Sequence, residues 1–188
     1  MKPVFSMVLL FCLVITNLNA KEREDVLVNG KAYDSKVAIK YGDTIETKKA
    51  SKLRFKIGKD AFLVNEKSNF TLTKKNGTNV FDLVKGSVMG VFSKGKHELK
   101  TPNLTAGIRG TAIFAKVKGD KTYFCTCYGE VEVDTYYSTD SKVLHASHHN
   151  MVWVSSDKIK DTAFMKFHTD DELRSLEKMV DRVPSFDK

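Results

Sequence analysis

Cysteine and proline are both scarce in this chain. Its 188 residues include three cysteines and three prolines. Cys12 lies in an apolar run near the N-terminus, which leaves Cys125 and Cys127 for the rest of the chain. Exported scaffolds that depend on disulfides usually carry more cysteines, spread through the sequence. The fold must therefore be stabilised by a hydrophobic core, for which a chain of this length is sufficient.

Arginine-rich blocks are also absent. The chain has 31 Lys and Arg residues against 23 Asp and Glu residues, a formal net charge of +8. The excess is spread as single lysines and short pairs, and no basic patch in the sequence is interleaved with stacking aromatic residues. Such a distribution aids solubility more often than it binds nucleic acid. Nucleic acid is therefore not an expected partner.

The first 20 residues have the layout of a secretory signal peptide. Lys2 supplies a positive charge, an apolar stretch follows it, and Ala20 is a small residue at the end. The apolar run is shorter than the roughly 20 residues that a membrane-spanning helix needs. We expect cleavage near Ala20 and a periplasmic or secreted protein without a transmembrane segment in the mature chain. An uncleaved anchor is the alternative.

Residues 25–155 repeat one sequence pattern. Short runs of alternating apolar residues, rich in Val, Ile, Thr, Phe and Tyr, are separated by Gly, Asn-Gly or charged turns. This pattern predicts an all-β domain of roughly ten short strands.

Residues 156–188 differ from the β region and predict a linker and one C-terminal amphipathic helix. Leu173 and Leu176 stand at helical spacing. Thr169 with Glu172 three residues later forms a capping box at the expected start of the helix. We expect the apolar stripe of this helix to pack on the β domain.

Four stretches of the β region follow one another in a recognisable order. They are YGDTIETKKASKLRFKIGKDAFLVNEKSNFTL (41–72), FDLVKGSVMGVF (81–92), TPNLTAGIRGTAIFAKV (101–117) and YGEVEV (128–133). Together they resemble the FecR domain, named for the periplasmic part of the ferric-citrate regulator of iron uptake. The resemblance implies a twisted all-β fold, of β-solenoid-like or sandwich type, in the periplasm. In the full-length regulators it also implies iron-related signalling.

The chain is similar, more narrowly, to a group of stand-alone exported FecR-domain proteins. The shared motifs are Cys-Thr-Cys-Tyr-Gly at 125–129, His-His at 148–149 and His-Thr-Asp at 168–170. This resemblance implies a binding module and no particular activity. The sigma-factor role of the full-length regulators is not carried over.

The direction of the two thiols depends on the regularity of their strand. In a regular strand Cys125, Cys127, Val131 and Val133 share one face, which would place both thiols on the side of the core. Gly129 is a plausible site for a β-bulge, and a bulge would reverse this relation.

Three interpretations of Cys125 and Cys127 remain open. They are inert core residues, a disulfide or redox pair, or metal ligands. Residues i and i+2 of a strand lie about 6.6 Å apart, close to the upper limit for a disulfide. Metal ligation by Zn, Cu or Fe needs further donors, and a Cys2His2 set would combine the thiols with His148 or His149 and with His168.

Two other polar residues have structural interpretations. His97 lies in a charged turn and is expected to be solvated. Arg109, between two glycines, is expected to bind neighbouring carbonyl groups or an acid such as Asp82.

The sequence thus predicts an exported, non-enzymatic module that binds an envelope protein or a small ligand and has a Cys/His metal site. A periplasmic thiol redox protein and a structural envelope module with inert cysteines are the alternatives.

Overall fold

The computed structural model describes residues 25–188, so the predicted signal peptide lies outside the described residues. The described chain is mostly β-structure with one C-terminal α-helix, which confirms the predicted fold class. It contains fifteen strands, more than the ten expected, because several long runs are divided by tight turns. None of the helices described is long and apolar enough to cross a membrane.

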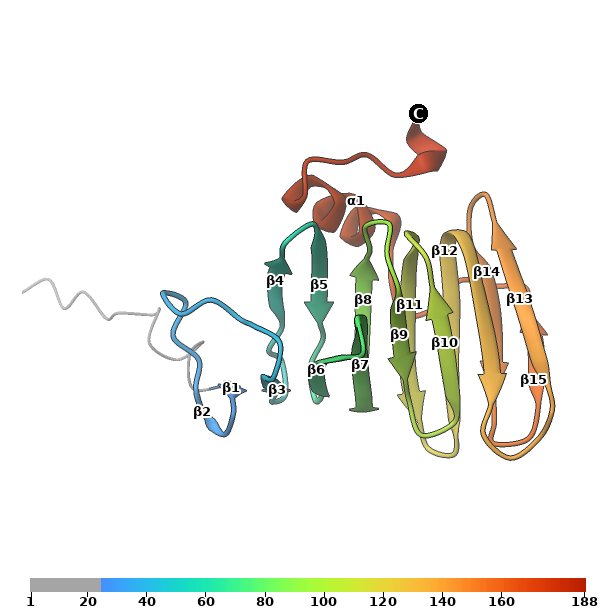
Figure 1. Ribbon diagram of the computed structural model, residues 1–188, viewed down its shortest axis with the longest axis horizontal. Helices are drawn as coiled ribbons and strands as arrows, with labels where there is room; N and C mark the ends of the chain where they lie inside the picture. Colours follow the sequence, from blue (N-terminus) through green and yellow to red (C-terminus); the bar gives the residue numbers. More distant parts are fainter. Residues whose placement is uncertain (1–24) are drawn as a thin grey trace, which may run out of the picture.

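The strands form two sheets that share β12 (Lys121–Thr135), the longest strand (Figure 1). The first sheet contains, in spatial order, β2 (Lys31–Ala32), β1 (Val26–Val28), β3 (Thr44–Thr47), β6 (Asn69–Lys75), β7 (Thr78–Lys85), β9 (His97–Lys100), β10 (Leu104–Ile108), the second half of β12, and β13 (Ser141–Ala146). The second contains β4 (Leu53–Ile57), β5 (Asp60–Val64), β8 (Ser87–Val91), β11 (Ala112–Lys118), the first half of β12, β14 (Asn150–Val154) and β15 (Ile159–Thr162). All these pairs are antiparallel except β7 with β9.

The main core lies between the two sheets. Phe62 of β5 in the second sheet contacts Phe81 and Phe70 of the first sheet, with ring centroids 5.1 and 5.8 Å apart. All three rings are buried. Burial of each such side chain contributes about 1.5–3 kcal/mol. This aromatic cluster provides the core that a chain with few cysteines needs.

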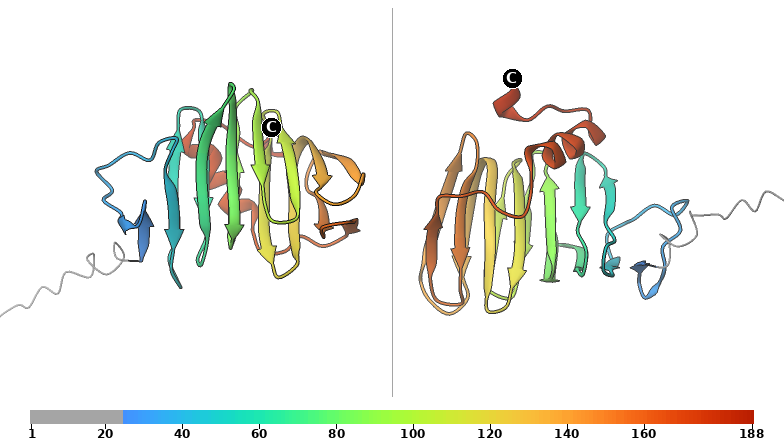
Figure 2. Two further views of the ribbon diagram at one scale, coloured as in Figure 1. Left: turned by 60° about the horizontal axis from the view of Figure 1, so that its bottom comes forward. Right: turned by 180° about the vertical axis from the view of Figure 1, so that it is seen from behind.

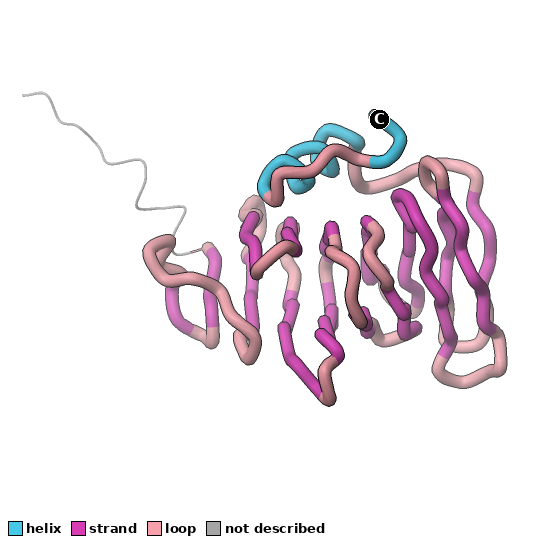
Figure 3. Tube along the Cα trace, turned by 45° about the horizontal axis from the view of Figure 1, so that its top comes forward, coloured by secondary structure: helices cyan, strands magenta, loops and turns pink. Residues whose placement is uncertain are grey.

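The second sheet has a further apolar layer on its outer face. Helix α1 (Asp170–Met179) lies over the strands there (Figure 3). It packs against β5 and β8 and buries Leu173 and Leu176. The predicted capping box is present, since Thr169 accepts from the backbone N–H of Glu172 and the Glu172 side chain accepts from that of Thr169. A short 3-10 helix, Ser185–Asp187, ends the chain.

The β-structure continues past residue 155, because β15 pairs with β14. The segment from β15 to α1 then crosses the outer face of the second sheet (Figure 2, right). There, the backbone N–H of Lys166 donates to the Tyr123 hydroxyl of β12 at 3.1 Å. The predicted linker is thus packed on the sheet.

The interpretation of His97 as a solvated residue is wrong. It begins β9, its side chain points inward, and it is 4% exposed. Nε2 donates to the Ser93 carbonyl at 3.0 Å, and Nδ1 accepts from Asn79 at 3.3 Å, so burial leaves no unpaired polar atom. Arg109 also differs from its prediction: it is exposed, and within residues 25–188 it forms no ion pair with Asp82.

Candidate metal centre

A β-bulge in β12 decides where the two thiols point. Ala112 of β11 pairs with Tyr128, and Ile113 pairs with Thr126, so Cys127 is an extra residue on its strand. Gly129 follows with φ of +88°, a left-handed conformation that suits glycine.

The bulge separates the thiols from the main core. Cys125 and Cys127 lie in the outer apolar layer under α1, whereas Val131 and Val133 belong to the core between the sheets. The regular-strand prediction, with the thiols beside these valines, is therefore wrong. A bulge does reverse the relation, as the alternative expected, but its extra residue is Cys127 and not Gly129. Both thiols are fully buried and free, with Sγ atoms 3.9 Å apart.

His149 approaches the thiols from the neighbouring strand edge. β13 and β14 pair in succession with the same edge of β12, and the bend between them lies opposite Cys127. The backbone N–H of His149 donates to the Cys127 carbonyl at 2.9 Å, and its φ of +56° turns the chain there. Its Nδ1 lies 3.3 Å from Cys125 Sγ.

His168 comes from the C-terminal segment, immediately before the helix cap Thr169. Its ring stacks on Phe114 of β11 with centroids 4.4 Å apart. Its Nδ1 donates to the Lys166 carbonyl at 2.9 Å, which leaves Nε2 directed toward Cys127 Sγ, 3.8 Å away. His168 is 6% exposed.

The ligand atoms of Cys125, Cys127, His149 and His168 all lie within 4.8 Å of one another. A tetrahedral Zn²⁺ with Zn–S bonds of about 2.3 Å and Zn–N bonds of about 2.0–2.1 Å separates its ligand atoms by roughly 3.3–3.8 Å. The contacts of 3.3, 3.8 and 3.9 Å in this cluster have that size. The four side chains therefore fit one four-coordinate ion.

Hydrogen bonds outside the cluster orient both imidazoles for ligation. Asp170, the first residue of α1, accepts from Nε2 of His149 at 2.7 Å, which leaves Nδ1 of His149 free of its proton. In His168 the roles of the two ring nitrogens are exchanged: Nδ1 donates to the Lys166 carbonyl, which leaves Nε2 free of its proton. Metal-ligating histidines characteristically have such partners, a carboxylate or a carbonyl, on the second nitrogen.

His148, the remaining predicted ligand, does not join the thiols. Its Nε2 donates to the second oxygen of Asp170 at 3.0 Å, and its ring packs on Phe186 at 4.1 Å. His148, His149 and Asp170 form a second group whose ligand atoms lie within 4.8 Å, but these atoms already bond one another and the imidazole of His148 is 47% exposed. His148 supports Asp170 in this arrangement.

Burial and hydrogen bonding shift the ionisation of the cluster. Burial is the main reason why the pKa of the Cys127 thiol lies well above its usual value, and Cys125 beside it raises it further. Burial opposes protonation of His149, but its contacts with Cys127 and Asp170 outweigh burial and raise its pKa. Partial burial likewise opposes ionisation of Asp170, yet the bonds from both histidines lower its pKa. A bound cation would have to displace the thiol proton of Cys127.

Comparison with known proteins supports the fold and nothing finer. No protein-family model and no curated protein matches the chain. Two crystal structures, at 1.65 and 2.50 Å resolution, of "a putative anti-sigma factor" from Parabacteroides distasonis ATCC 8503 are similar to it. Both have a TM-score of 0.55, with 12% and 11% sequence identity. The match covers 63% of this chain and 58% of the Parabacteroides chain, so it shows a shared β architecture over part of each protein.

In the sequence, Asp170 stands out only as the last residue of the His-Thr-Asp motif. Its bonds to two histidines appear only once the bend after β13 is folded against α1. The His-Thr-Asp motif at 168–170 could have indicated this role. It places a candidate ligand, His168, and a carboxylate, Asp170, on either side of the cap residue Thr169.

Proposed function

We propose that this chain is an exported, non-enzymatic FecR-type binding module whose C-terminal segment is attached to its β-sheet by a zinc ion. The ligands are Cys125, Cys127, His149 and His168. The observation that carries the proposal is the convergence of four donor atoms, from three separate chain segments, within 4.8 Å of one another, with three of their contacts at 3.3–3.9 Å.

Zinc is favoured over copper and iron by the ligand set. A buried tetrahedral set of two thiolates and two imidazoles is characteristic of structural Zn²⁺ sites. Two thiolates also balance the two charges of the ion, so the assembled site is neutral where it is buried. Both cysteines are fully buried, and the imidazole of His149 is 8% exposed.

The role that fits this geometry is structural. All four positions of a tetrahedral ion are taken by side chains, whereas a catalytic zinc keeps a position open for water or substrate. The ion would join β12 to His168, 41 residues further along the chain than Cys127. It would thereby fix the start of α1 on the second sheet.

The wider setting is part of the same proposal. The four FecR-like stretches and the shared β architecture support a module of this type, and the expected leader in residues 1–20 supports export to the periplasm or beyond. An envelope protein or a small ligand is the proposed partner.

A thiol redox function is less well supported. Redox-active cysteines are exposed and have a lowered thiol pKa. Cys127 has the opposite properties, since it is fully buried and its pKa is raised. If the chain were a redox protein, both thiols of the metal-free form would oxidise reversibly to a disulfide under mild conditions, which thiol titration before and after reduction would detect.

Metal analysis of protein purified without chelator tests the proposal. We expect about one zinc ion per chain in the wild type and a strong loss in Cys127→Ser and His168→Ala. His145→Ala is the matched control, because that exposed imidazole pairs with Glu130 and lies outside the cluster. Cobalt substitution should give the absorption bands of a tetrahedral thiolate site. Little metal in the wild type, or full metal in Cys127→Ser, would overturn the proposal, whereas stoichiometric copper or iron would correct the metal and keep the site.

A further inference from the structure

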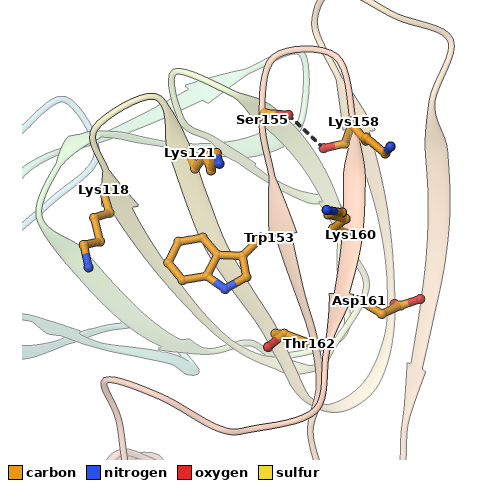
Figure 4. Close-up of a pocket in the computed structure, with 8 residues that line it drawn as sticks. All are labelled: Lys118, Lys121, Trp153, Ser155, Lys158, Lys160, Asp161 and Thr162. Atoms are coloured by element: carbon orange, nitrogen blue, oxygen red, sulfur yellow. Dashed lines mark hydrogen bonds between the residues drawn. The ribbon is translucent and has the colours of Figure 1, made fainter.

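A surface rich in lysine surrounds the one tryptophan of the chain, Trp153. It is a hollow of about 570 Å³ on the second sheet, at the end of β11, β12, β14 and β15 that α1 does not cover. Figure 4 shows the indole with lysines on either side. We call this region the lysine–tryptophan surface; it consists of Lys118, Lys121, Trp153, Lys158 and Lys160 together with Ser155 and Thr162.

Strand pairing places these residues side by side on the outer face. Lys118 pairs with Lys121 across the β11–β12 hairpin, and Trp153 pairs with Lys160 across β14 and β15. Paired residues on neighbouring strands point to the same face and lie about 5 Å apart. The four lysines are all exposed, and they come from two hairpin regions that are well separated in the sequence.

The positive charge of this surface is not neutralised by the protein. None of the four lysines forms an ion pair with any residue in 25–188. Asp161 is the one acidic residue that lines the hollow, and both of its carboxylate oxygens bond Lys142, at 2.5 and 2.7 Å. Like charges directly opposite one another on a sheet are destabilising. An anionic ligand would remove this repulsion.

We propose that the lysine–tryptophan surface binds an acidic polysaccharide, one whose sugar rings carry carboxylate or sulfate groups. The indole of Trp153 offers a flat apolar face to a sugar ring. The hydroxyl groups of Ser155 and Thr162 can bond sugar hydroxyls, and the lysines bind the acidic groups. This site is separate from the metal cluster, and it supplies a ligand class for the binding module.

The shape of the surface favours a polysaccharide over two other polyanions. A bilayer is bound by apolar side chains that protrude beyond the basic ones, whereas Trp153 is only partly exposed and lines a hollow between lysines. Single-stranded nucleic acid is bound on successive aromatic platforms. Trp153 is the one aromatic residue that lines this hollow, and the neighbouring Phe167 ring is edge-on to the indole, at 86°, and does not extend a row of stacking faces.

Trp153 provides a direct readout in protein of constant metal content, because it is the one tryptophan of the chain and lies in this surface. Titration with polygalacturonate and with dextran sulfate should change the emission and reach saturation for at least one of them, while neutral dextran should have no effect. The change should weaken steeply with added salt. The double variant Lys118→Glu with Lys158→Glu should lose affinity at least tenfold.

The matched control is Lys74→Glu with Lys75→Glu, which changes the net charge equally on the exposed β6–β7 hairpin of the first sheet. It should bind within about twofold of the wild type, since long-range charge effects are screened by salt. The lysines replaced in the two double variants are all exposed, so circular dichroism should show folded protein in both.

Two results would overturn the proposal. One is equal loss in the two double variants, which would show attraction by net charge alone. The other is failure of both acidic polymers to bind. The proposal is overturned in that case even if a single-stranded oligonucleotide or phosphatidylglycerol vesicles bind to the surface and lose affinity in the Lys118→Glu with Lys158→Glu variant.

Discussion

Replacement of Asp170 by asparagine tests the metal site without touching a ligand. Asp170 holds His149 through a bond of 2.7 Å, and its other oxygen accepts from His148. Asparagine has nearly the same shape and keeps an acceptor oxygen, but it loses the negative charge that makes this bond strong and makes the imidazole a better ligand. The helix start and the four donors should remain in place.

The expected size of the effect follows from the position of Asp170 outside the ligand set. Loss of such an outer-sphere partner lowers metal affinity by about 10–100-fold, or about 1.4–2.7 kcal/mol. Loss of a ligand should cost more. Asp170→Asn should therefore still bind zinc at high concentration and should keep the tetrahedral spectrum of the cobalt form.

Asp171→Asn is a closely matched control. Asp171 occupies the next position in the first turn of α1, so both substitutions remove one favourable interaction with the helix dipole. Its side chain is 93% exposed and pairs with Arg174 alone. Affinity should be measured for both variants by competition with a chromogenic chelator. If Asp170→Asn and Asp171→Asn bind zinc within about twofold of each other, then Asp170 does not orient a ligand of the metal.

Three further predictions concern the parts of the fold that support the site. Removal of metal with a chelator should change the emission of Trp153, because Phe167 precedes the ligand His168 in the chain and packs against the indole with centroids 6.2 Å apart. Unchanged emission would mean that the segment around His168 stays in place without metal. Gly129→Ala should lower the free energy of unfolding by about 1–3 kcal/mol, since φ is +88° and a Cβ would lie 2.6 Å from a threonine methyl carbon. Gly119→Ala, in open space, should cost less in the same urea titration. Leu176→Ala should cost about 2–5 kcal/mol because this side chain is fully buried, and a smaller loss would show that α1 is not firmly docked.

Local patterns in the sequence predicted the regular parts of the fold well. Alternation of apolar residues indicated the strands, and the capping box of Thr169 and Glu172 is present in the structure. These features depend on residues close together in the chain. The side on which the thiols lie depends instead on the pairing of Ala112 and Ile113 with β12, which places an extra residue at Cys127. No alternation pattern within β12 contains that information.

The lysine–tryptophan surface was missed for a related reason. In the sequence its lysines are isolated residues or short pairs, and they suggest solubility. Pairing of β11 with β12 and of β14 with β15 gathers them around Trp153. His97 shows the same limitation, because its charged neighbours in the chain suggested solvent, whereas its spatial neighbours are Phe81 and Phe92.

The two proposed sites both lie on the outer face of the second sheet, and each includes residues of β12. Cys125, Cys127 and Tyr123 belong to the same outer layer of β12. Tyr123 contacts both Trp153 and Phe167, with ring centroids 5.3 and 5.4 Å apart.

Phe167 therefore has neighbours from both sites. It precedes the ligand His168, and the Nζ atoms of Lys116 and Lys118 lie 4.9 and 5.9 Å from its ring. A metal ion that fixes His168 would also hold Phe167 against the indole, and would fix one of the lysines that line the hollow. Because coupling between two sites is reciprocal, zinc should strengthen polysaccharide binding by the same factor by which the polysaccharide strengthens zinc binding. Equal affinity for polygalacturonate or dextran sulfate with and without metal would show that the two sites are independent.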